Sequence, residues 1–303
     1  DQSHHMPELF VSGPDALAQL QWIGGNDLSN LNGLDGGRAK QFVGCTERGH
    51  VIGDCILYDL GGGSYELVSS MPLLNWVEYQ AHTGAWDVAL ERDNNTSDNP
   101  TGRRRRFRYQ LDGPNAGAIF DEVVDGASPE IGFFRTARLS IAGVEVIVLR
   151  HSMSGHRGFE ISGPYEHAET VRGEILAAGE RHGLLQGGTK AYYSASFEGG
   201  WMAYPLPGIY TGEELRPYRE WLPASSWEGR FQLAGSFRPT DIEDYYVTPW
   251  DLGYGKLVHF GHDFIGRAAL REVAKRPPRT RVTLVWNTDD VLRVFRSQFE
   301  PGT

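Results

Sequence analysis

The residues that could carry out chemistry are a few acids and tyrosines beside glycine-rich turns. Glu160 stands in the stretch 158–164 (GFEISGP), where a short apolar strand follows a turn and a Gly-Pro pair precedes a helix. A carboxylate in such a strand needs a partner, because an unpaired buried charge is costly or shifts its pKa. Glu160 is therefore either the partner of an internal arginine or a hydrogen-bond acceptor for a ligand.

Tyr192 is a second candidate, and it lies in an aromatic-rich section that also holds Ser194 and Glu198. Tyrosine is commonly a core residue whose hydroxyl is bonded to the backbone. Aromatic side chains in irregular segments can instead line a pocket for a flat ligand. Both roles stay open for Tyr192 on the residue types alone.

The sequence has no Walker loop, dinucleotide fingerprint, zinc spacing or nucleophile elbow. His4 and His5 are metal-ligating types, but no second cluster of ligands accompanies them, so we expect no metal.

The basic run 103–106 (RRRR) is interpreted as a solvated strand edge. Contact with the anionic tail of a cofactor is the alternative.

Composition narrows the class of protein. The 303 residues carry a net charge of −10, which gives no support for nucleic-acid binding. This length predicts two or three domains. Cys45 and Cys55 form no disulfide framework, and the longest apolar run, 144–149, is too short to span a bilayer. Without a signal peptide, we expect a cytoplasmic protein with no membrane partner.

Short strands and amphipathic helices must position these residues. Strands are predicted at 8–11, 38–43, 51–59, 65–68, 107–111, 137–149 (a hairpin), 159–162 and 282–286, and helices at 16–20, 72–82, 115–124 and 165–182. Asp263 is the predicted N-cap of a further helix. The sections from 184 to 210 and from 245 to 255 are rich in aromatic residues and poor in regular periodicity.

One pattern recurs: a strand, a Gly-Pro pair and a helix follow one another around Gly13, Gly113 and Gly163. It favours two related α+β subdomains, each an antiparallel sheet covered by helices. The alternative is that strand-to-helix turns simply favour Gly-Pro. When the three copies are aligned at their Gly-Pro pairs, Phe10 and Gln110 align with Glu160. Only the third copy therefore carries a glutamate at this position.

Several separated stretches resemble the glycine-cleavage T-protein (aminomethyltransferase) family: 158–164 (GFEISGP), 248–253 (TPWDLG) and 263–270 (DFIGRAAL). Within that family the chain is most similar to the tetrahydrofolate-dependent O-demethylases of aryl methyl ethers such as vanillate and syringate. The stretches that carry this similarity are 1–6 (DQSHHM), 49–54 (GHVIGD), 218–223 (YREWLP) and 242–247 (IEDYYV). The resemblance covers nearly the whole chain.

The resemblance implies three domains in a cloverleaf around a folate channel, two of them α+β and the third a C-terminal β-barrel. We expect residues 1–47 with 137–222 to form the first subdomain, and 48–136 with 223–274 the second. Residues 275–303 are expected to be a linker toward a barrel outside this sequence. An N-terminal arm that supplies an aromatic side chain is expected to be missing too.

The resemblance also implies catalytic and cofactor roles. Tyr192 is the expected general acid for the departing phenol oxygen, since its ordinary pKa of about 10 resembles that of the phenol. Asp54 matches the aspartate near the reactive end of the folate. Glu160 is expected to accept two parallel hydrogen bonds from the pterin, with Gln110, Trp201 and Met6 as further cofactor contacts.

Gln2 and His5 match positions beside the aryl substrate, and Ser70 is the departure that matters there. Vanillate demethylases carry at that position an arginine that anchors the substrate carboxylate. Loss of one charge-assisted pair, about 1.5–3 kcal/mol, is expected to weaken benzoate binding by roughly one to two decades. We therefore expect either another basic residue or a methoxyphenol substrate with a neutral or differently placed tail.

The expected function is a metal-independent methyltransferase of one-carbon metabolism and aromatic catabolism. It would move a methyl group from a lignin-derived methoxyphenol or methoxybenzoate to N5 of tetrahydrofolate, giving a phenol and 5-methyltetrahydrofolate. A transferase with a sulfonium or amine donor is one alternative. A folate-binding module without transfer activity is the other.

Overall fold

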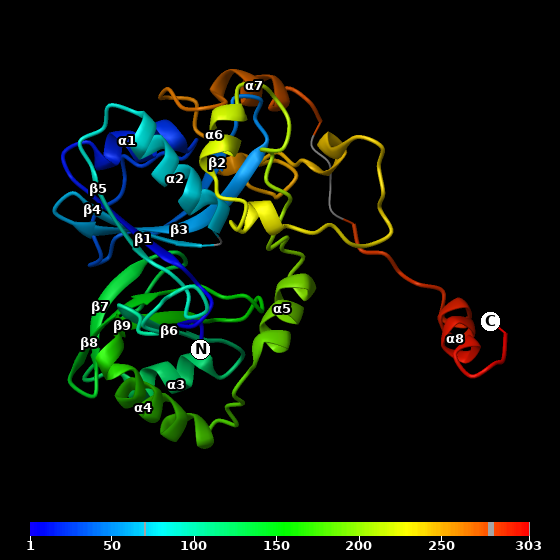
Figure 1. The fold of residues 1–303 in the computed structure, drawn as a ribbon. Helices are drawn as coiled ribbons and strands as arrows, with labels where there is room; N and C mark the ends of the chain where they lie inside the picture. Colours follow the sequence, from blue (N-terminus) through cyan, green and yellow to red (C-terminus); the bar gives the residue numbers. More distant parts are fainter. Residues whose placement is uncertain (70, 278–281, 303) are drawn as a thin grey trace.

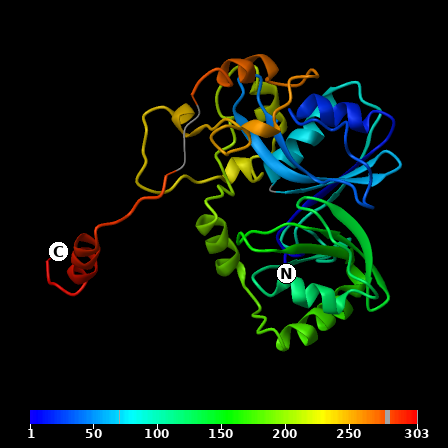
Figure 2. The same cartoon turned by 180° about the vertical axis from the view of Figure 1, so that it is seen from behind.

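A computed structural model describes residues 1–69, 71–277 and 282–302, and its body consists of two antiparallel sheets (Figures 1 and 2). The first sheet has the order β2-β3-β4-β1-β5. Its strands are β1 (Glu8–Ser12), β2 (Lys40–Cys45), β3 (Val51–Gly61), β4 (Ser64–Ser69) and β5 (Ala89–Asp93). Helices α1 (Ala16–Ile23) and α2 (Met71–Thr83) cover one face, where Leu20 and Trp76 pack on Leu9 and Leu67.

The second sheet has the order β6-β9-β8-β7. Its strands are β6 (Arg106–Leu111), β7 (Thr136–Ile141), β8 (Val144–Leu149) and β9 (Phe159–Pro164). Helices α3 (Ala116–Val123) and α4 (Ala168–Glu180) cover its outer face. The rings of Phe120 and Phe159 stack there with centroids 3.8 Å apart. The uncovered faces of the two sheets meet through a smaller apolar cluster that includes Tyr58, Val68 and Ile147.

The two halves have the same topology. The order β1-α1-β2-β3-β4-α2 recurs as β6-α3-β7-β8-β9-α4, and both four-strand sets pair in the same order. The predicted pair of related antiparallel subdomains is confirmed. Gly13 and Gly113 occupy matching turns with φ of +123° and +112°, a conformation that glycine adopts without strain.

The sequence alignment of the third Gly-Pro pair was wrong. Gly163 and Pro164 still belong to β9, whose counterpart in the first half is β4, not β1. Strand register shows this directly: Phe10 pairs with Glu66 as Gln110 pairs with Glu160. Both halves therefore carry a glutamate at this position.

The predicted discontinuous subdomains do not match the strand pairing. Residues 1–47 were grouped with 137–222, which separates β2 from β3, although these strands pair from Lys40 to Cys45. Each sheet is instead built from consecutive strands, because short connections place neighbouring strands side by side. The role of residues 275–303 as a linker stays a prediction.

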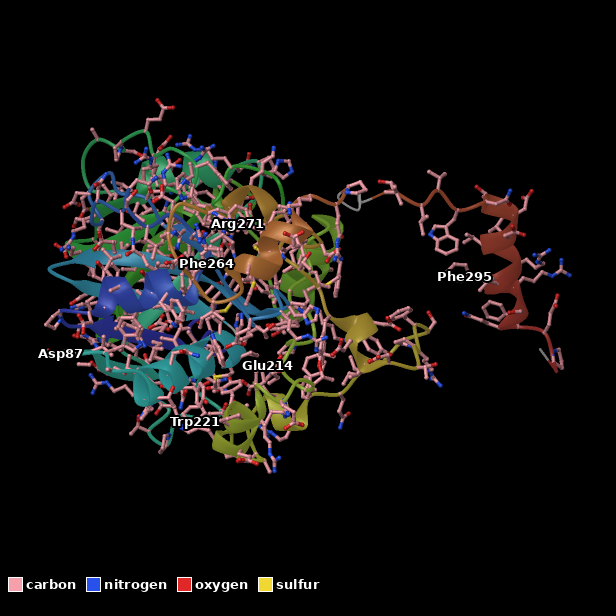
Figure 3. All side chains as sticks on the ribbon, turned by 90° about the horizontal axis from the view of Figure 1, so that it is seen from above. Asp87, Glu214, Trp221, Phe264, Arg271 and Phe295 are labelled. Atoms are coloured by element: carbon pink, nitrogen blue, oxygen red, sulfur yellow. The ribbon has the colours of Figure 1, made fainter. Side chains whose placement is uncertain are left out.

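Other elements correct the sequence prediction. Residues 282–286 form no strand, and α7 (Arg267–Val273) begins after Gly266, whose φ is +85°, not at Asp263. The sequence did not predict β5, α5 (Thr189–Glu198), α6 (Arg216–Trp221), α8 (Thr288–Ser297) or the short 3-10 helices η2 (Glu228–Arg230), η3 (Ile242–Tyr245) and η4 (Gly255–Leu257). The helix predicted at 165–182 begins as the 3-10 helix η1 (Tyr165–His167). Helix α8, with Phe295, lies apart from the sheets (Figure 3). Within the described ranges, no helix is long and apolar enough to cross a bilayer.

Candidate active site

A cavity of about 360 Å³, here called the central cavity, lies between the two sheets. The first sheet contributes Asp54 and Ile56 from β3, and the second contributes Glu160 from β9. Aromatic residues of the section after α4 close it. Six of the residues predicted for the site line this one cavity: Gln2, Met6, Asp54, Glu160, Tyr192 and Trp201.

A larger cavity of about 550 Å³, the side cavity, lies between the second sheet and the helices α4 and α5. His5 and Gln110 line it, together with apolar residues of α4 such as Ile175. Gln2 and Tyr192 line both cavities. Met153 also lines both, so the two cavities adjoin at these three residues.

The interpretation of Glu160 as the partner of an internal arginine is confirmed, and its role as an acceptor for a ligand stays a prediction. Tyr58 Oη and Arg108 Nη1 each donate a hydrogen bond to Glu160 Oε1, both at 2.6 Å. In the part of the chain that the structure describes, no hydrogen bond to Oε2 is found. Burial alone would raise the pKa of this carboxyl, but Arg108, with His151 and the Tyr58 hydroxyl, holds it below its ordinary value. Glu160 is an ionised acceptor in the cavity wall.

Arg108 is the buried residue that holds this carboxylate in place. Its guanidinium also donates to Glu8 Oε1 at 2.8 Å and to Glu66 Oε1 at 2.5 Å. Burial raises the pKa of Glu8 to about 7. Arg108 was not predicted from the sequence, although strict alternation along β6 places it on the same face as Gln110.

Asp54 lies on the opposite wall in a second polar network. Its Oδ2 accepts hydrogen bonds from Gln41 Nε2 at 2.6 Å and from Tyr254 Oη at 3.0 Å. Trp201 Nε1 in turn donates to Tyr254 Oη at 2.6 Å. Burial raises the pKa of Asp54 to about 6, although these two hydrogen bonds act to lower it. Sequence reasoning did not find Gln41 or Tyr254, because neither stands in a chemical motif.

Tyr192 reaches the junction of the cavities from α5. Burial raises the pKa of its hydroxyl well above the ordinary value, and the negative charge of Glu160 adds to the shift. The hydroxyl therefore stays protonated at neutral pH. The ring of His5 packs edge-on against the ring of Tyr192, with centroids 5.4 Å apart. The aromatic section was expected to be irregular, so the helix that aims Tyr192 was not predicted.

The predicted cofactor and substrate residues do not separate into the two cavities. Gln110, expected beside the pterin, lines the side cavity, where its Nε2 donates to the His151 carbonyl at 3.1 Å. His5, expected beside the substrate, also lines the side cavity, whereas Gln2 lines both. Ser70 lies outside the described residues. No group of three potential metal ligands occurs within the described ranges.

His151 is a further residue of the central cavity that sequence reasoning missed. Its Nδ1 is buried and has no hydrogen-bond partner among the described residues. Burial lowers the pKa of the imidazole, so the ring is neutral at neutral pH. It adds an uncharged hydrogen-bonding group close to Glu160.

Comparison with known proteins finds a matching family and similar proteins. The GCVT N-terminal domain family matches residues 1–206. The chain is 43% identical to syringate O-demethylase of Sphingobium sp. (strain NBRC 103272 / SYK-6) over 299 residues, 99% of this chain and 64% of that protein. It is 31% identical to sesamin methylene transferase of Sinomonas sp. (strain No.22) over 298 residues, 97% of this chain and 62% of that protein. The chain thus spans less than two thirds of these two relatives.

A solved structure gives the same picture of the fold. The crystal structure of the glycine cleavage system aminomethyltransferase T from Bartonella henselae aligns with a TM-score of 0.62 at 18% sequence identity. The alignment covers 91% of this chain and 63% of that one. At this identity, the likeness concerns the fold alone.

Proposed function

Because the chain belongs to the GCVT N-terminal domain family, we propose that it transfers a methyl group from an aromatic methyl ether to N5 of tetrahydrofolate. The products are a phenol and 5-methyltetrahydrofolate. The name of the Sphingobium relative, syringate O-demethylase, supports an aromatic methyl ether as the donor. Lignin-derived methoxyphenols and methoxybenzoates form the substrate class.

The observation that carries the proposal is the place of Tyr192 at the junction of two cavities. Direct methyl transfer needs donor and acceptor held in line in adjoining sites. A phenoxide is a poor leaving group, so the departing oxygen needs a proton or a strong hydrogen bond. Burial keeps Tyr192 protonated, so we assign its hydroxyl the donation of this strong hydrogen bond to the departing oxygen. Because its pKa lies above that of the phenol, the proton is shared in the transition state and not given up beforehand.

The residues around Glu160 fit tetrahydrofolate. An ionised carboxylate with one oxygen unengaged by the described residues can accept the adjacent N–H groups of a pterin. Trp201 provides an aromatic wall nearby. Met6 and Gln110 are the remaining cofactor contacts that we assign. When bound, tetrahydrofolate supplies the N5 atom that accepts the methyl group.

Asp54 and its partners act on the opposite side of the central cavity. With its pKa near 6, this carboxyl can hold or release a proton close to neutral pH. Its hydrogen bond with Tyr254 keeps Trp201 oriented. Gln2 and His5 are the side chains that we assign to the aryl ring. Since Ser70 replaces the anchoring arginine, a neutral methoxyphenol is the preferred substrate.

A panel of methyl donors tests the proposal. Incubation with tetrahydrofolate and guaiacol, vanillate or syringate should yield 5-methyltetrahydrofolate and the matching phenol in equal amounts, with guaiacol turned over faster than vanillate. Dimethylsulfoniopropionate, which would give a thioether in place of a phenol, should not be turned over. Turnover of the sulfonium donor alone would identify a different transferase. Tetrahydrofolate binding without turnover of any donor would identify a folate-binding module. Equal rates for vanillate and guaiacol would remove the preference for a neutral tail.

A further inference from the structure

The internal duplication gives several residues of the central cavity a counterpart in the other half. Register defines the counterparts: Ile56 of β3 pairs with Gln41 of β2, as Ile147 of β8 pairs with Arg138 of β7. The same offset in β3 and β8 relates Asp54 to Glu145. The counterparts are Met6 and Arg106, Gln41 and Arg138, Asp54 and Glu145, Ile56 and Ile147, and His151 and Leu60.

The counterparts line a cavity of their own. Arg106, Arg138, Glu145, Ile147 and Leu60 all border a cavity of about 600 Å³ where the two sheets meet again. None of the residues that we assign to methyl transfer lines it. We call it the duplicate cavity, and we propose that it is a binding site for a small, multiply charged oxyanion.

Two exchanges between the halves change the chemistry of the cavity. Arg106 stands where the other half has Met6, and Arg138 stands where it has Gln41. Two positions that carry uncharged side chains in the central cavity therefore carry guanidinium groups here. The basic run 103–106 supplies the rest of the positive charge. In all, five arginines face two glutamates, Glu145 and Glu166, in the lining.

The guanidinium groups of Arg106 and Arg138 have N–H groups that form no short hydrogen bond with a carboxylate in the described ranges. The shortest approach of Arg106 to a carboxylate is 3.6 Å, from Nε to Glu66 Oε2, and this buried Nε has no hydrogen-bond partner among the described residues. Arg138 stands 3.7 Å from Glu145 and 3.9 Å from Asp35. These ion-pair separations exceed hydrogen-bond length, so the pairs leave N–H groups available. Arg138 Nη2 does donate a long hydrogen bond of 3.5 Å to the Leu60 carbonyl.

Arg104, in the same basic run, is an arginine whose guanidinium is engaged by other groups of the protein. It is buried, and its guanidinium donates to the carbonyls of Ser3 and Met6 and pairs with Asp93 at 3.1 Å. The interpretation of the run as a solvated edge is therefore wrong for Arg104. Arg103 and Arg105 are exposed and complete the rim of the duplicate cavity, where Arg105 is paired with the exposed Glu91 at 2.6 Å.

The charge and size of the cavity indicate the ligand. Excess positive charge in the lining favours an anion with two or more charges, and the forked guanidinium geometry suits phosphate or carboxylate oxygens. The available volume suits a small molecule. A phosphorylated metabolite and a polycarboxylate share this chemistry, and two probes separate them.

Isothermal calorimetry with inorganic pyrophosphate and with citrate, at matched ionic strength and without folate or methyl ether, tests the site. We expect one anion to bind at a 1:1 ratio. Arg138→Gln, which introduces the residue found at the counterpart position, should weaken binding about tenfold, the effect of losing one charge-assisted contact. Arg106→Met should do the same. Arg181→Gln removes an exposed arginine paired with Glu122 elsewhere and should leave binding unchanged.

Each outcome has a clear meaning. Tighter binding of pyrophosphate identifies a phosphate site, and tighter binding of citrate identifies a polycarboxylate site. Absence of saturable binding of both anions, or an affinity of Arg138→Gln within twofold of the parent, would overturn the proposal. Arg138 is exposed, so its variant tests the site even if Arg106→Met does not fold. Since no methyl donor is present, these results stand apart from those of the transfer assay.

Discussion

Glu66 and Glu160 occupy the same register in the two halves of the molecule, yet their surroundings differ. Glu66 is paired through both oxygens, with Arg108 at 2.5 Å and Arg106 at 3.6 Å. Glu160 meets Arg108 and Tyr58 through one oxygen and lines the central cavity. The position of the acid belongs to the repeated fold. Its availability to a ligand depends on the residues that the other half places opposite it.

A difference between matching positions also produces the ion pair between the two halves. Glu8 and Arg108 are counterparts, because they lie two residues before Phe10 and Gln110 in matching strands. They bind each other at 2.8 Å across the boundary between the halves. One acid-to-base difference between the copies thus creates the cation on which the buried carboxylates depend.

We expect removal of the Arg108 guanidinium to have the largest effect on the free energy of unfolding. Arg108→Met leaves three carboxylates, those of Glu8, Glu66 and Glu160, buried without their main partner. Loss of one member of a buried ion pair costs about 3–5 kcal/mol, so we expect at least this drop in the free energy of unfolding in urea. Arg105→Met, which removes an exposed pair with Glu91, should cost under about 1 kcal/mol. Similar costs for the two variants would contradict the central role of Arg108.

Tyr192→Phe isolates the proposed proton donor from the rest of the cavity wall. General-acid catalysis contributes about 10² or more, so kcat should fall by about that factor. The dissociation constant of tetrahydrofolate, measured by fluorescence titration, should not change, since the ring remains. Tyr193→Phe, on the same helix, is the matched control and should keep most of the activity. A variant Tyr192→Phe with unchanged kcat would remove the general acid from the proposal.

The two glutamates can be compared directly through their amides. Glu160→Gln should weaken tetrahydrofolate binding by roughly tenfold to a hundredfold, since a charged acceptor contributes about 1.5–3 kcal/mol. Glu66→Gln changes the same register position in the other half and should lower stability more than affinity. The measurements are calorimetric titration with tetrahydrofolate and urea unfolding of both variants. Equal losses of affinity would mean that the two positions do not differ in function.

Much of the fold could be predicted because alternating strands and Gly-Pro turns carry local signals. The T-protein resemblance, read from motifs such as 263–270, is confirmed by the family match over residues 1–206. The division into subdomains failed, because it depends on which strands pair, and pairing is not a local property. Helix α5 was missed because its section has the aromatic content of a binding loop and little periodicity.

The site was predictable only where a residue stands in a motif. Glu160, Tyr192 and Asp54 do, and all three line the central cavity. Arg108 and Tyr254 act through partners about 50 and 200 positions away in the chain. Only the folded structure brings such partners together. Whether each residue performs its assigned role stays a prediction for the variants described here.

The pH dependence of stability gives the most specific test of the Glu8–Arg108 pair. Burial raises the pKa of Glu8 from its ordinary 4.5 to about 7, so the folded protein holds a proton that the unfolded chain releases. The stabilisation is complete below about pH 4.5 and is lost as the pH rises through about 7. We expect Glu8→Gln to flatten the fall in unfolding free energy across this window by about 2–3 kcal/mol.

Asp54 must be separated from Glu8 in this measurement, because burial also raises its pKa, to about 6. Asp54→Asn should remove the part of the slope between about pH 4 and 6 and leave the part up to about 7 that belongs to Glu8. Urea unfolding at pH 4.5, 6 and 8 for both variants and the double variant distinguishes the two contributions. If Glu8→Gln retains the full slope of the parent, the proton is held elsewhere, and Glu8 is an ionised partner of Arg108 in the same way as Glu66.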